Sequence, residues 1–552
     1  MKRSMKFKNK SQKGMVLLVF IVLLLMLSLI GISSIITSTG EMKGAGNELR
    51  QTGSFYAAES GIEKAAAEIS TSYETMGVPP NPLPSGSFNE GGYQYDFSTV
   101  DGGPAVQTML SDGGFRGLFG FVKRFDISST GIDNLRESSV KITMAMQDAL
   151  IPIFQFAVFY QNDLEIAPGP NMTLGGRVHS NSDIYLQSNN NLYVDSYLTS
   201  AGDILHGRRD GSGQPVGSGD VFIMDRNSAY QNMKNTDGSW LDSQINDWVP
   251  NSLSRWGGRV EDSNHGITEL NMPVVVDGPA TDLIDRGGGN NDSFENKAGL
   301  KLIDGRAIYR HLDGSWQDVT AQLILDGAIT VGEFYDGREG VDVNSLDLDI
   351  EKLDDSGYFP LNGIIYNSQQ PVGGIITAMR LTNGVELPAA LTVATDNPLY
   401  TVGNFNTTRK KPAALMADAI TILSGNWRDI ESRHGLGSRV ASATQVNACF
   451  MTGNVETGVD GNGYSGGLEN LPRFLEKWDG VEFSWRGSMV DLWYSRQATS
   501  AWSYGGYYTA PDRNWAFDPD LLDIANLPPG TPMVNVVLRS KWFQQVGESP
   551  TS

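Results

Sequence analysis

Acidic residues at alternating positions form the strongest metal-ligand pattern in this chain. In the segment SLDLDIEKLDDSG, carboxylates occur at Asp347, Asp349, Glu351, Asp354 and Asp355. Oxygen ligands at every second residue can converge on one hard cation, and four of these residues are the candidate calcium ligands: Asp347, Asp349, Glu351 and Asp355. However, the position where an EF-hand loop needs glycine is Lys352. Leucine and isoleucine interleave with the acids, so the favoured interpretation is an amphipathic segment with an acidic outer face, and we expect no cofactor.

The remaining residues that could do chemistry form weaker patterns. The five histidines are His179, His206, His265, His311 and His434. They form no H-E-x-x-H motif and no i,i+4 pair, and the chain has no C-x-x-C, so we expect structural or surface histidines. Ser465 lies in GYSGG (residues 463–467), which resembles a serine-protease nucleophile loop, but Tyr464 replaces the aspartate and no histidine segment accompanies it. We therefore expect no catalytic residue and no enzyme activity.

Cys449 is the single cysteine, so no intramolecular disulfide can form. Its neighbours are apolar, and a buried thiol acting as a small apolar filler is the favoured interpretation. A reactive thiol or an intermolecular bridge is the alternative.

The elements that must position these residues begin with a membrane segment. The basic sequence MKRSMKFKNKSQKG holds six lysines and arginines, and no charge follows Lys13 until Glu41. Residues 15–36 as a helix would be about 33 Å long, enough to cross a bilayer core of roughly 30 Å. No small-x-small cleavage site follows, which disfavours an ordinary secretory signal. The basic side is expected to stay cytoplasmic, so the remaining residues face outward.

The chain continues beyond the membrane as an amphipathic helix. Apolar or small residues recur at spacings of three and four, with a change of phase near Thr52 and Gly53: Met42, Ala45, Leu49, Phe55, Ala58, Ile62, Ala65 and Ile69. Such a stripe needs a partner surface, either the chain's own globular part or neighbouring copies.

The rest of the chain is predicted to be mainly β. We expect a linker and small antiparallel sheet over 71–150, a β-rich core over 151–206 plus 396–552, and a loop-rich insertion over 207–395. Short runs punctuated by Gly and Asn at 171–204 favour a β-solenoid without a strict repeat length, and a sandwich is the alternative. The overall class is α+β. The net charge is −21, or −27 without the six positive charges of residues 1–14, which disfavours nucleic acid as a partner.

The aromatic C-terminal tail has three open interpretations. Its large rings include Trp478, Trp485, Trp493, Tyr494, Trp502, Tyr504, Tyr507, Tyr508, Trp515 and Phe517. They can fill a Gly-rich β core, stack on surface sugars, or dock partner subunits.

The N-terminal features together resemble type IV pilin-like proteins. In that family a prepilin peptidase cleaves after the Gly that ends a short basic leader, and the matching bond here is Gly14–Met15. The closer resemblance is to PilX-type minor pilins. Its pieces are the Lys13–Gly14 junction, the small and polar exit at 31–40, and the YAAESGIE segment at 56–63. The resemblance covers residues 1 to about 70, with 1–14 as leader and 15–70 as helix.

One departure from the family pattern is informative. Major pilins usually have Glu at the fifth mature position, where this chain has Val19. The resemblance implies that this Glu pairs with the amine of the subunit below, because a carboxylate in hydrocarbon costs several kcal/mol unless it meets a cation. Val19 offers no such pairing. The resemblance therefore implies a minor, priming or tip-located subunit.

The resemblance also implies a location and partners. The expected location is the bacterial inner membrane, with a single pass, a periplasmic ectodomain, and a pilus tip or cell-surface position after assembly. Expected partners are other pilins and minor pilins, the prepilin peptidase and the inner-membrane assembly platform. Processing by the peptidase would leave a methylated N-terminus. Surface glycans are a further possible ligand. The alternatives are a signal-anchored adhesin or glycan-binding protein, and a β-solenoid enzyme acting on acidic polysaccharide.

Overall fold

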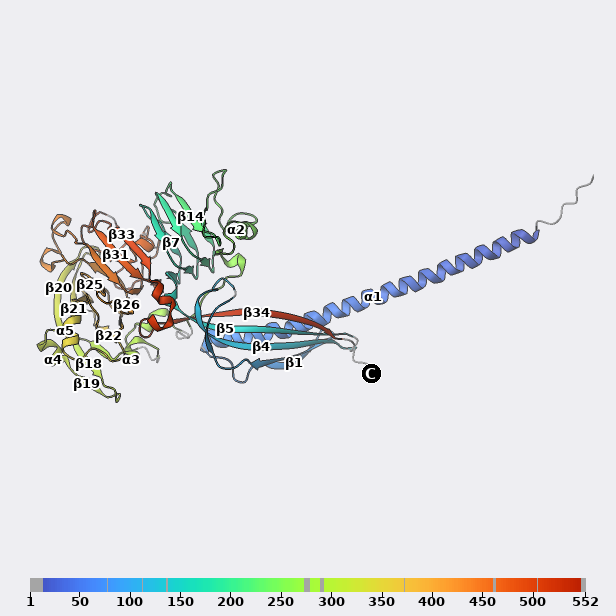
Figure 1. The fold of residues 1–552 in the computed structure, drawn as a ribbon, viewed down its shortest axis with the longest axis horizontal. Coiled ribbons are helices and arrows are strands. Elements are labelled where there is room, and N and C mark those ends of the chain that lie inside the picture. The colour runs from blue at the N-terminus through green and yellow to red at the C-terminus, as the bar shows by residue number, and fades with distance from the viewer. Residues whose placement is uncertain are drawn as a thin grey trace, which may run out of the picture.

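Three parts follow one another along the long axis of the molecule: a projecting helix, an antiparallel sheet and a large β-rich head (Figure 1). The computed structural model describes residues 13–76, 78–111, 113–135, 138–272, 278–287, 292–371, 373–459, 463–503 and 505–547. The expected leader, residues 1–14, thus lies outside the described residues except for its last two.

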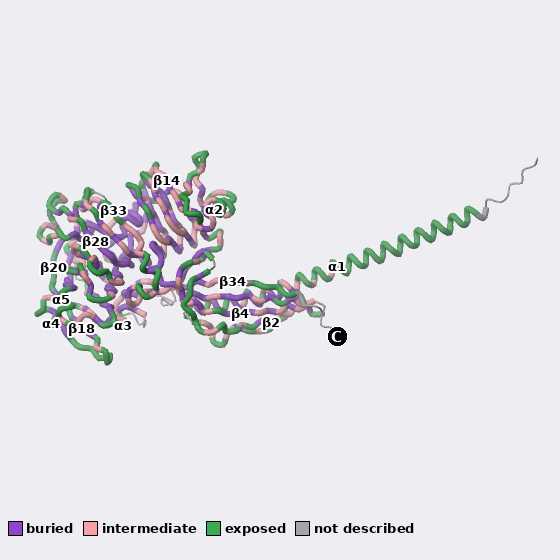
Figure 2. The backbone as a smooth tube through the Cα atoms, viewed as in Figure 1, coloured by how far each residue is buried: buried purple, intermediate pink, exposed green. Residues whose placement is uncertain are grey.

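Helix α1 (Lys13–Met76) is a single element of 64 residues. At 1.5 Å per residue it is about 96 Å long. Residues 15–45 are exposed, whereas most of the helix from Ser54 to Tyr73 lies against the sheet (Figure 2). The predicted continuous helix is confirmed, and it ends six residues beyond the expected boundary at residue 70.

The antiparallel sheet, here called the anchor sheet, packs on the outer half of α1. Its strand order is β1-β2-β4-β5-β34, and β3 pairs with β4. The strands are β1 (Ser85–Glu90), β2 (Tyr93–Asp101), β3 (Val106–Met109), β4 (Phe119–Asp133), β5 (Ser139–Pro152) and β34 (Met533–Gly547). Alternation in β4 and β5 places one apolar face on the helix, as predicted.

The anchor sheet differs from the prediction in one respect. The expected module ended at residue 150, but β34, from the end of the chain, pairs with β5 along its whole length. The head therefore lies between two neighbouring strands of the sheet. Sequence reasoning missed this because nothing local marks a strand as the partner of another strand almost 400 residues away.

The head is a three-sided β-solenoid of parallel strands. Its widest face has the order β16-β12-β9-β6-β32-β29-β26-β24-β22-β17-β18-β19, with parallel pairing from β16 to β17. These strands are β16 (Val260–Glu261), β12 (Leu198–Ser200), β9 (Val178–Ser180), β6 (Val158–Tyr160), β32 (Met489–Asp491), β29 (Cys449–Thr452), β26 (Ala413–Ala417), β24 (Leu391–Thr395), β22 (Ile364–Ser368), β17 (Leu300–Ile303), β18 (Arg306–Arg310) and β19 (Trp316–Asp318).

The two other faces are each formed by two sheets. One contains β13 (Ile204–His206), β10 (Ile184–Leu186) and β7 (Leu164–Ile166), then β30 (Pro472–Phe474), β27 (Ile420–Leu423), β25 (Leu399–Val402), β23 (Ile376–Thr382), β21 (Val341–Asp349) and β20 (Ile329–Asp336). The other contains β15 (Tyr230–Asn232), β14 (Asp220–Met224), β11 (Asn191–Val194) and β8 (Met172–Leu174), then β33 (Asp512–Phe517), β31 (Glu482–Gly487) and β28 (Thr444–Asn447).

The first coils have a regular period that the sequence analysis did not detect. Val178 pairs with both Val158 and Leu198, and Ile184 pairs with both Leu164 and Ile204. Equivalent residues such as His179 and Thr199 are 20 residues apart. The repeat is hidden because it spans few coils and the third coil carries long excursions between β13 and β14 and between β14 and β16. The solenoid prediction is thus confirmed.

The chain builds the solenoid from its middle. It starts at β6, runs outward to β16, crosses to β17 at the far end, and returns coil by coil to β32, which pairs with β6. The expected insertion at 207–395 therefore supplies solenoid strands such as β14 and β17–β24 and is not a separate loop-rich unit. The described part of the head also contains the short α-helices α2 (Trp248–Trp256), α3 (Phe294–Lys297), α4 (Thr320–Leu325) and α5 (Ile350–Asp355).

Candidate functional site: the anchor helix and its junction with the head

The inner half of α1 is an uncovered apolar surface. The helix contains a segment long and apolar enough to cross a membrane, and none of it is buried by the rest of the protein. Met15 and Val19 are 72% and 52% exposed, and Gly14 lies in the first turn of the helix. Leaving so many large apolar side chains in water would cost roughly 1.5–3 kcal/mol each, so this segment requires a lipid or protein environment. The described residues of this chain thus leave Val19 exposed.

A short stalk links the apolar segment to the anchor sheet. Met42 and Leu49 are 69% and 71% exposed, so the first part of the predicted stripe is not covered by this chain. Gly40, Gly44 and Gly46 face open space. Only the second part of the predicted stripe is therefore covered by a surface within the molecule.

Small residues allow α1 to lie close to the anchor sheet. Ala58, Ile62, Ala65 and Ile69 are buried against β2, β4 and β5. A Cβ atom on Gly131 of β4 would lie 2.5 Å from the Ala58 nitrogen, and one on Gly61 would lie 3.1 Å from the Phe97 Cβ. The small residues of the YAAESGIE segment thus have a packing function: they let a helix backbone approach a strand backbone.

Strand β34 fastens the end of the chain to this helix. Arg539 donates to both carboxylate oxygens of Glu63, at 2.6 and 2.9 Å. The Trp542 ring packs edge-on against Phe55 at 5.8 Å, and the Asn535 amide donates to Asp148. Burial raises the pKa of Asp148 to about 7, with the Asn535 hydrogen bond opposing.

The seam where β6 meets β32 holds buried acids. Tyr160 pairs in register with Asp491, and Glu165 accepts hydrogen bonds from Thr457 and Ser465. Burial raises the pKa of Glu469 to about 7, although its carboxylate accepts from the Ala167 N–H at 2.9 Å. Burial also raises the pKa values of Glu165 and Asp491. Sequence reasoning missed this cluster because its members are about 300 residues apart.

Comparison with known proteins agrees with the first of these features. Residues 13–63 match the model of the PilX N-terminal family. The chain has a PilX-type N-terminal region. The resemblance stated from the sequence is confirmed over these residues, which supports a membrane-anchored, type IV pilus-related subunit.

Similarity over the rest of the chain is weaker. Among solved structures, the competence-associated pilin ComZ from Thermus thermophilus is similar, with 12% identity, 90% of this chain and 98% of that chain covered, and a TM-score of 0.28. At that score the superposition supports no detailed correspondence. No curated protein matches this chain.

The candidate calcium ligands do not converge. Arg380 donates to both oxygens of Asp347, at 2.9 and 2.5 Å, and also pairs with Asp429. Asp349 caps α5 by accepting from the Lys352 N–H at 3.1 Å, and it also accepts from Asn383 at 2.7 Å. Both aspartates are buried, so the expected acidic outer face is wrong for them, because β21 is covered on both sides.

The last two candidates lie on α5. Glu351 and Asp355 are exposed and line an open hollow of 400 Å³. Among the described residues, no three acidic, histidine or cysteine side chains are grouped as a metal site would need. The calcium interpretation thus lacks a coordinating cluster.

Ser465 is not placed as a nucleophile. It is buried, its hydroxyl donates to Glu165, and it accepts from the Gly467 N–H at 3.1 Å. No histidine contacts it in the part of the chain that the structure describes.

A Ser–His–Asp chain is present elsewhere. His265 Nε2 lies 2.6 Å from Ser252 Oγ, and its Nδ1 lies 2.7 Å from Asp262. Ser252 is fully buried within α2, and its hydroxyl also donates to the Val249 carbonyl at 3.1 Å. A nucleophile needs access to its substrate, so this arrangement has the distances of a catalytic triad without its accessibility. Although burial acts to raise it, hydrogen bonds from His265, Ser243, Asn264 and Trp248 hold the pKa of Asp262 below its usual value. We interpret the Ser252–His265–Asp262 arrangement as a structural hydrogen-bond network that caps a helix end.

The other histidines have structural surroundings. His179 is fully buried between Thr199 and Asn181, each at 2.9 Å, and burial lowers its pKa to about 4. His206 stacks on Trp240, His311 donates from Nε2 to the Gln317 amide oxygen, and His434 pairs with Glu431.

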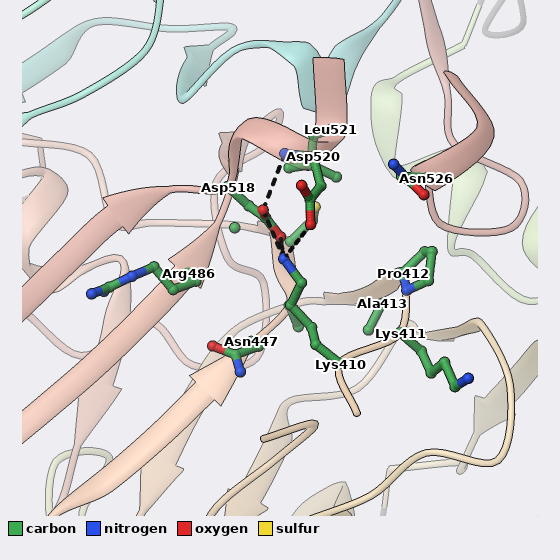
Figure 3. Close-up of a pocket in the computed structure, with 13 residues that line it drawn as sticks. Lys410, Lys411, Pro412, Ala413, Asn447, Arg486, Asp518, Asp520, Leu521 and Asn526 are labelled. Atoms are coloured by element: carbon green, nitrogen blue, oxygen red, sulfur yellow. Dashed lines mark hydrogen bonds and ion pairs between the residues drawn. The ribbon is translucent and has the colours of Figure 1, made fainter. Parts of the chain in front are cut away.

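Cys449 is buried and lines a small cavity in the head. Figure 3 shows this cavity, with Lys410 and Asp518 among the residues around it. Burial raises the pKa of its thiol well above the usual value. The cavity measures 60 Å³, and Lys410 spans it to Asp518 and Asp520 at 2.7 and 2.8 Å. A space of that size holds water rather than a sugar or nucleotide, and the buried filler is the interpretation that the structure supports for this cysteine.

Part of the aromatic tail fills the core. Trp478, Trp485, Trp493 and Tyr508 are buried. Trp502, Tyr507, Trp515 and Phe517 are half-buried, and Tyr494 is 36% exposed. Tyr504 lies outside the described residues. Core packing is thus the role of the four buried rings.

Proposed function

We propose that this protein is a minor pilin-like subunit that primes a type IV pilus-related filament or occupies its tip. The observation that carries the proposal is the position of the head. It is inserted between β5 and β34 at the end of the anchor sheet farthest from the apolar half of α1 (Figure 1). In a shaft, the next subunit would need the space that the head occupies, whereas a terminal subunit has no neighbour there.

Two further features support a terminal subunit. Val19 offers no carboxylate to the amine of a neighbouring subunit, and the exposed Met42 and Leu49 provide an apolar surface for other pilin helices. Under this proposal, residues 15–36 lie in the inner membrane, the head faces the periplasm, and the prepilin peptidase and assembly platform are partners.

We also infer that the role is interaction without a catalytic step or a resident cofactor. The buried hydroxyls of Ser252 and Ser465 support this inference.

Processing and position can be tested together. Co-expression with a prepilin peptidase should remove residues 1–14, which mass spectrometry of the mature N-terminus detects, and Gly14→Arg should block the cleavage. A tag placed in the exposed turn near Asp313 should label filament ends in electron microscopy. Labels spaced along the shaft, or filaments of unchanged number in a strain lacking the protein, would contradict the proposal.

The distinction from a signal-anchored adhesin follows from the same experiment. An adhesin that never enters a filament would retain its leader, or would stay with the membrane fraction after filaments are sheared off.

A further inference from the structure

Three arginines surround one tyrosine where the head meets the anchor sheet. The guanidinium carbons of Arg177, Arg259 and Arg116 lie 3.8, 5.5 and 5.6 Å from the centre of the Tyr197 ring. Arg177, Tyr197 and Arg259 immediately precede β9, β12 and β16, so the solenoid stacks them at one corner of successive coils. Arg116 comes from the segment before β4 in the anchor sheet.

This arginine cluster lacks matching negative charge. Each guanidinium donates to a backbone carbonyl: Arg116 to Gly258 at 3.1 Å, Arg177 to Gly114 at 2.9 Å, and Arg259 to Asp195 at 3.1 Å. Within the described parts of the chain, no carboxylate forms an ion pair with any of the three. Glu261 faces Arg116 and Arg177, and Asp225 faces Arg259. His265 also faces Glu261. Three positive charges thus face two negative charges, so the cluster keeps an excess of positive charge in a protein whose net charge is −21.

The cluster is also shielded from water. Arg177 is 8% exposed, while Arg116, Arg259 and Tyr197 are half-buried. The Nε of Arg116 is buried and has no hydrogen-bond partner. Burial, together with repulsion from Arg116 and Arg259, lowers the pKa of Arg177 to about 10, while Tyr197 opposes this shift. Like charges held together in a half-buried site are costly unless an anion joins them.

Guanidinium groups are suited to oxyanions. Their planar N–H forks match the oxygens of a carboxylate, sulfate or phosphate and form charge-assisted hydrogen bonds. The acidity of the whole molecule sets a size limit, because a long polyanion would meet repulsion outside the cluster. The site therefore favours a single compact anionic group.

We propose that Arg116, Arg177 and Arg259 form a binding site for a compact oxyanion at the junction of the head and the anchor sheet. The ligand is either a free inorganic anion or the acidic group of a small sugar derivative. Because the site joins segments of the anchor sheet and the solenoid, anion binding would also stabilise the head against its base.

The test uses the full chain in detergent. Inorganic phosphate, glucose 6-phosphate and glucuronate are compared with sodium chloride at equal ionic strength, by isothermal titration and by the thermal midpoint. We expect at least one of the three to bind and to raise the midpoint. Saturation by phosphate identifies a free anion, and a preference for either sugar derivative identifies the acidic-sugar source.

Variants locate the binding. Arg259→Gln and Arg116→Gln should each weaken binding by roughly tenfold or more, since each removes a charged hydrogen bond. Arg177 is left intact because it is buried and donates to two carbonyls of the 113–118 segment, those of Gly114 and Arg116. The matched control is Arg226→Gln, an exposed arginine outside the cluster, which should leave affinity unchanged.

Three results would overturn the proposal: no effect of the three anions beyond that of chloride, equal affinity in Arg259→Gln and the parent protein, or tighter binding of heparin than of the small anions. None of these results bears on leader cleavage or filament position, so the proposed function would stand independently.

Discussion

The buried carboxyl of Glu469 predicts how the seam between the first and last coils responds to pH. Its pKa is about 7 in the folded protein, against an ordinary value of 4.5. Between these values the folded state holds a proton that the unfolded state has lost, so the free energy of unfolding falls as the pH rises. The full difference corresponds to about 3 kcal/mol, reached above pH 7.

Glu469→Gln should remove this penalty. The glutamine is neutral at every pH and can still accept from the Ala167 N–H through its oxygen. We expect the variant to be more stable than the parent protein by about 3 kcal/mol near pH 8, and to gain nothing below about pH 4.5. The acids Glu165 and Asp491 and the bases Arg208 and Arg513 share this environment, so they must be left unchanged.

The assay is urea unfolding of the full chain in detergent, followed by tryptophan fluorescence at several pH values. Glu482→Gln is the matched control, because Glu482 is exposed and hydrogen bonds from Ser484 and Asn514 lower its pKa. That control should show no gain at high pH. A stability difference between Glu469→Gln and the parent protein that is the same at pH 4.5 and pH 8 would refute the argument.

Three further predictions follow from packing. Gly131→Ala should destabilise the anchor sheet by about 1–3 kcal/mol, because the added Cβ meets the α1 backbone. Gly46 faces open space, so Gly46→Ala should instead stabilise α1 by up to about 1 kcal/mol. Thermal unfolding of both variants measures the two changes in stability, and equal effects would contradict the close approach of helix and strand. Arg380→Ala should lower the free energy of unfolding by about 3–5 kcal/mol, since it leaves Asp347 buried without its cation. Arg306→Ala, at an exposed ion pair, should lower it by under about 1 kcal/mol. A small loss for Arg380→Ala in urea unfolding would mean that water replaces the guanidinium. A fluorophosphonate probe should not label Ser252 and iodoacetamide should not label Cys449 in the folded protein, because both residues are buried. If mass spectrometry shows labelling of either residue in native protein, the structural interpretation of that residue is wrong.

Several parts of the molecule could be predicted because their signals are local. The 15–36 run identifies the membrane segment through composition, and the 3.6-residue period identifies the helix that continues it. Alternation at Val140, Ile142 and Met144 identifies β5 and its buried face. The PilX-type resemblance depends on the same contiguous residues, and the family match covers them.

Other parts depend on which distant segments meet. The charge pattern around Asp347 is compatible with calcium, but Arg380 and Asp429 reach this aspartate from elsewhere in the chain and satisfy it. The arginine cluster likewise depends on the stacking of Arg177, Tyr197 and Arg259 in successive coils, because nothing in their separate sequences brings them together.

The sequence alone therefore determined that a membrane helix anchors an acidic, β-rich head, because composition and short periods act between neighbouring residues. Only the tertiary structure decided that β34 closes the anchor sheet, that β6 meets β32 in the middle of the solenoid, and which charged side chains are already paired. Parallel coils and strand partners are chosen by hydrogen bonds and packing between residues far apart in the chain, and no local pattern encodes those choices.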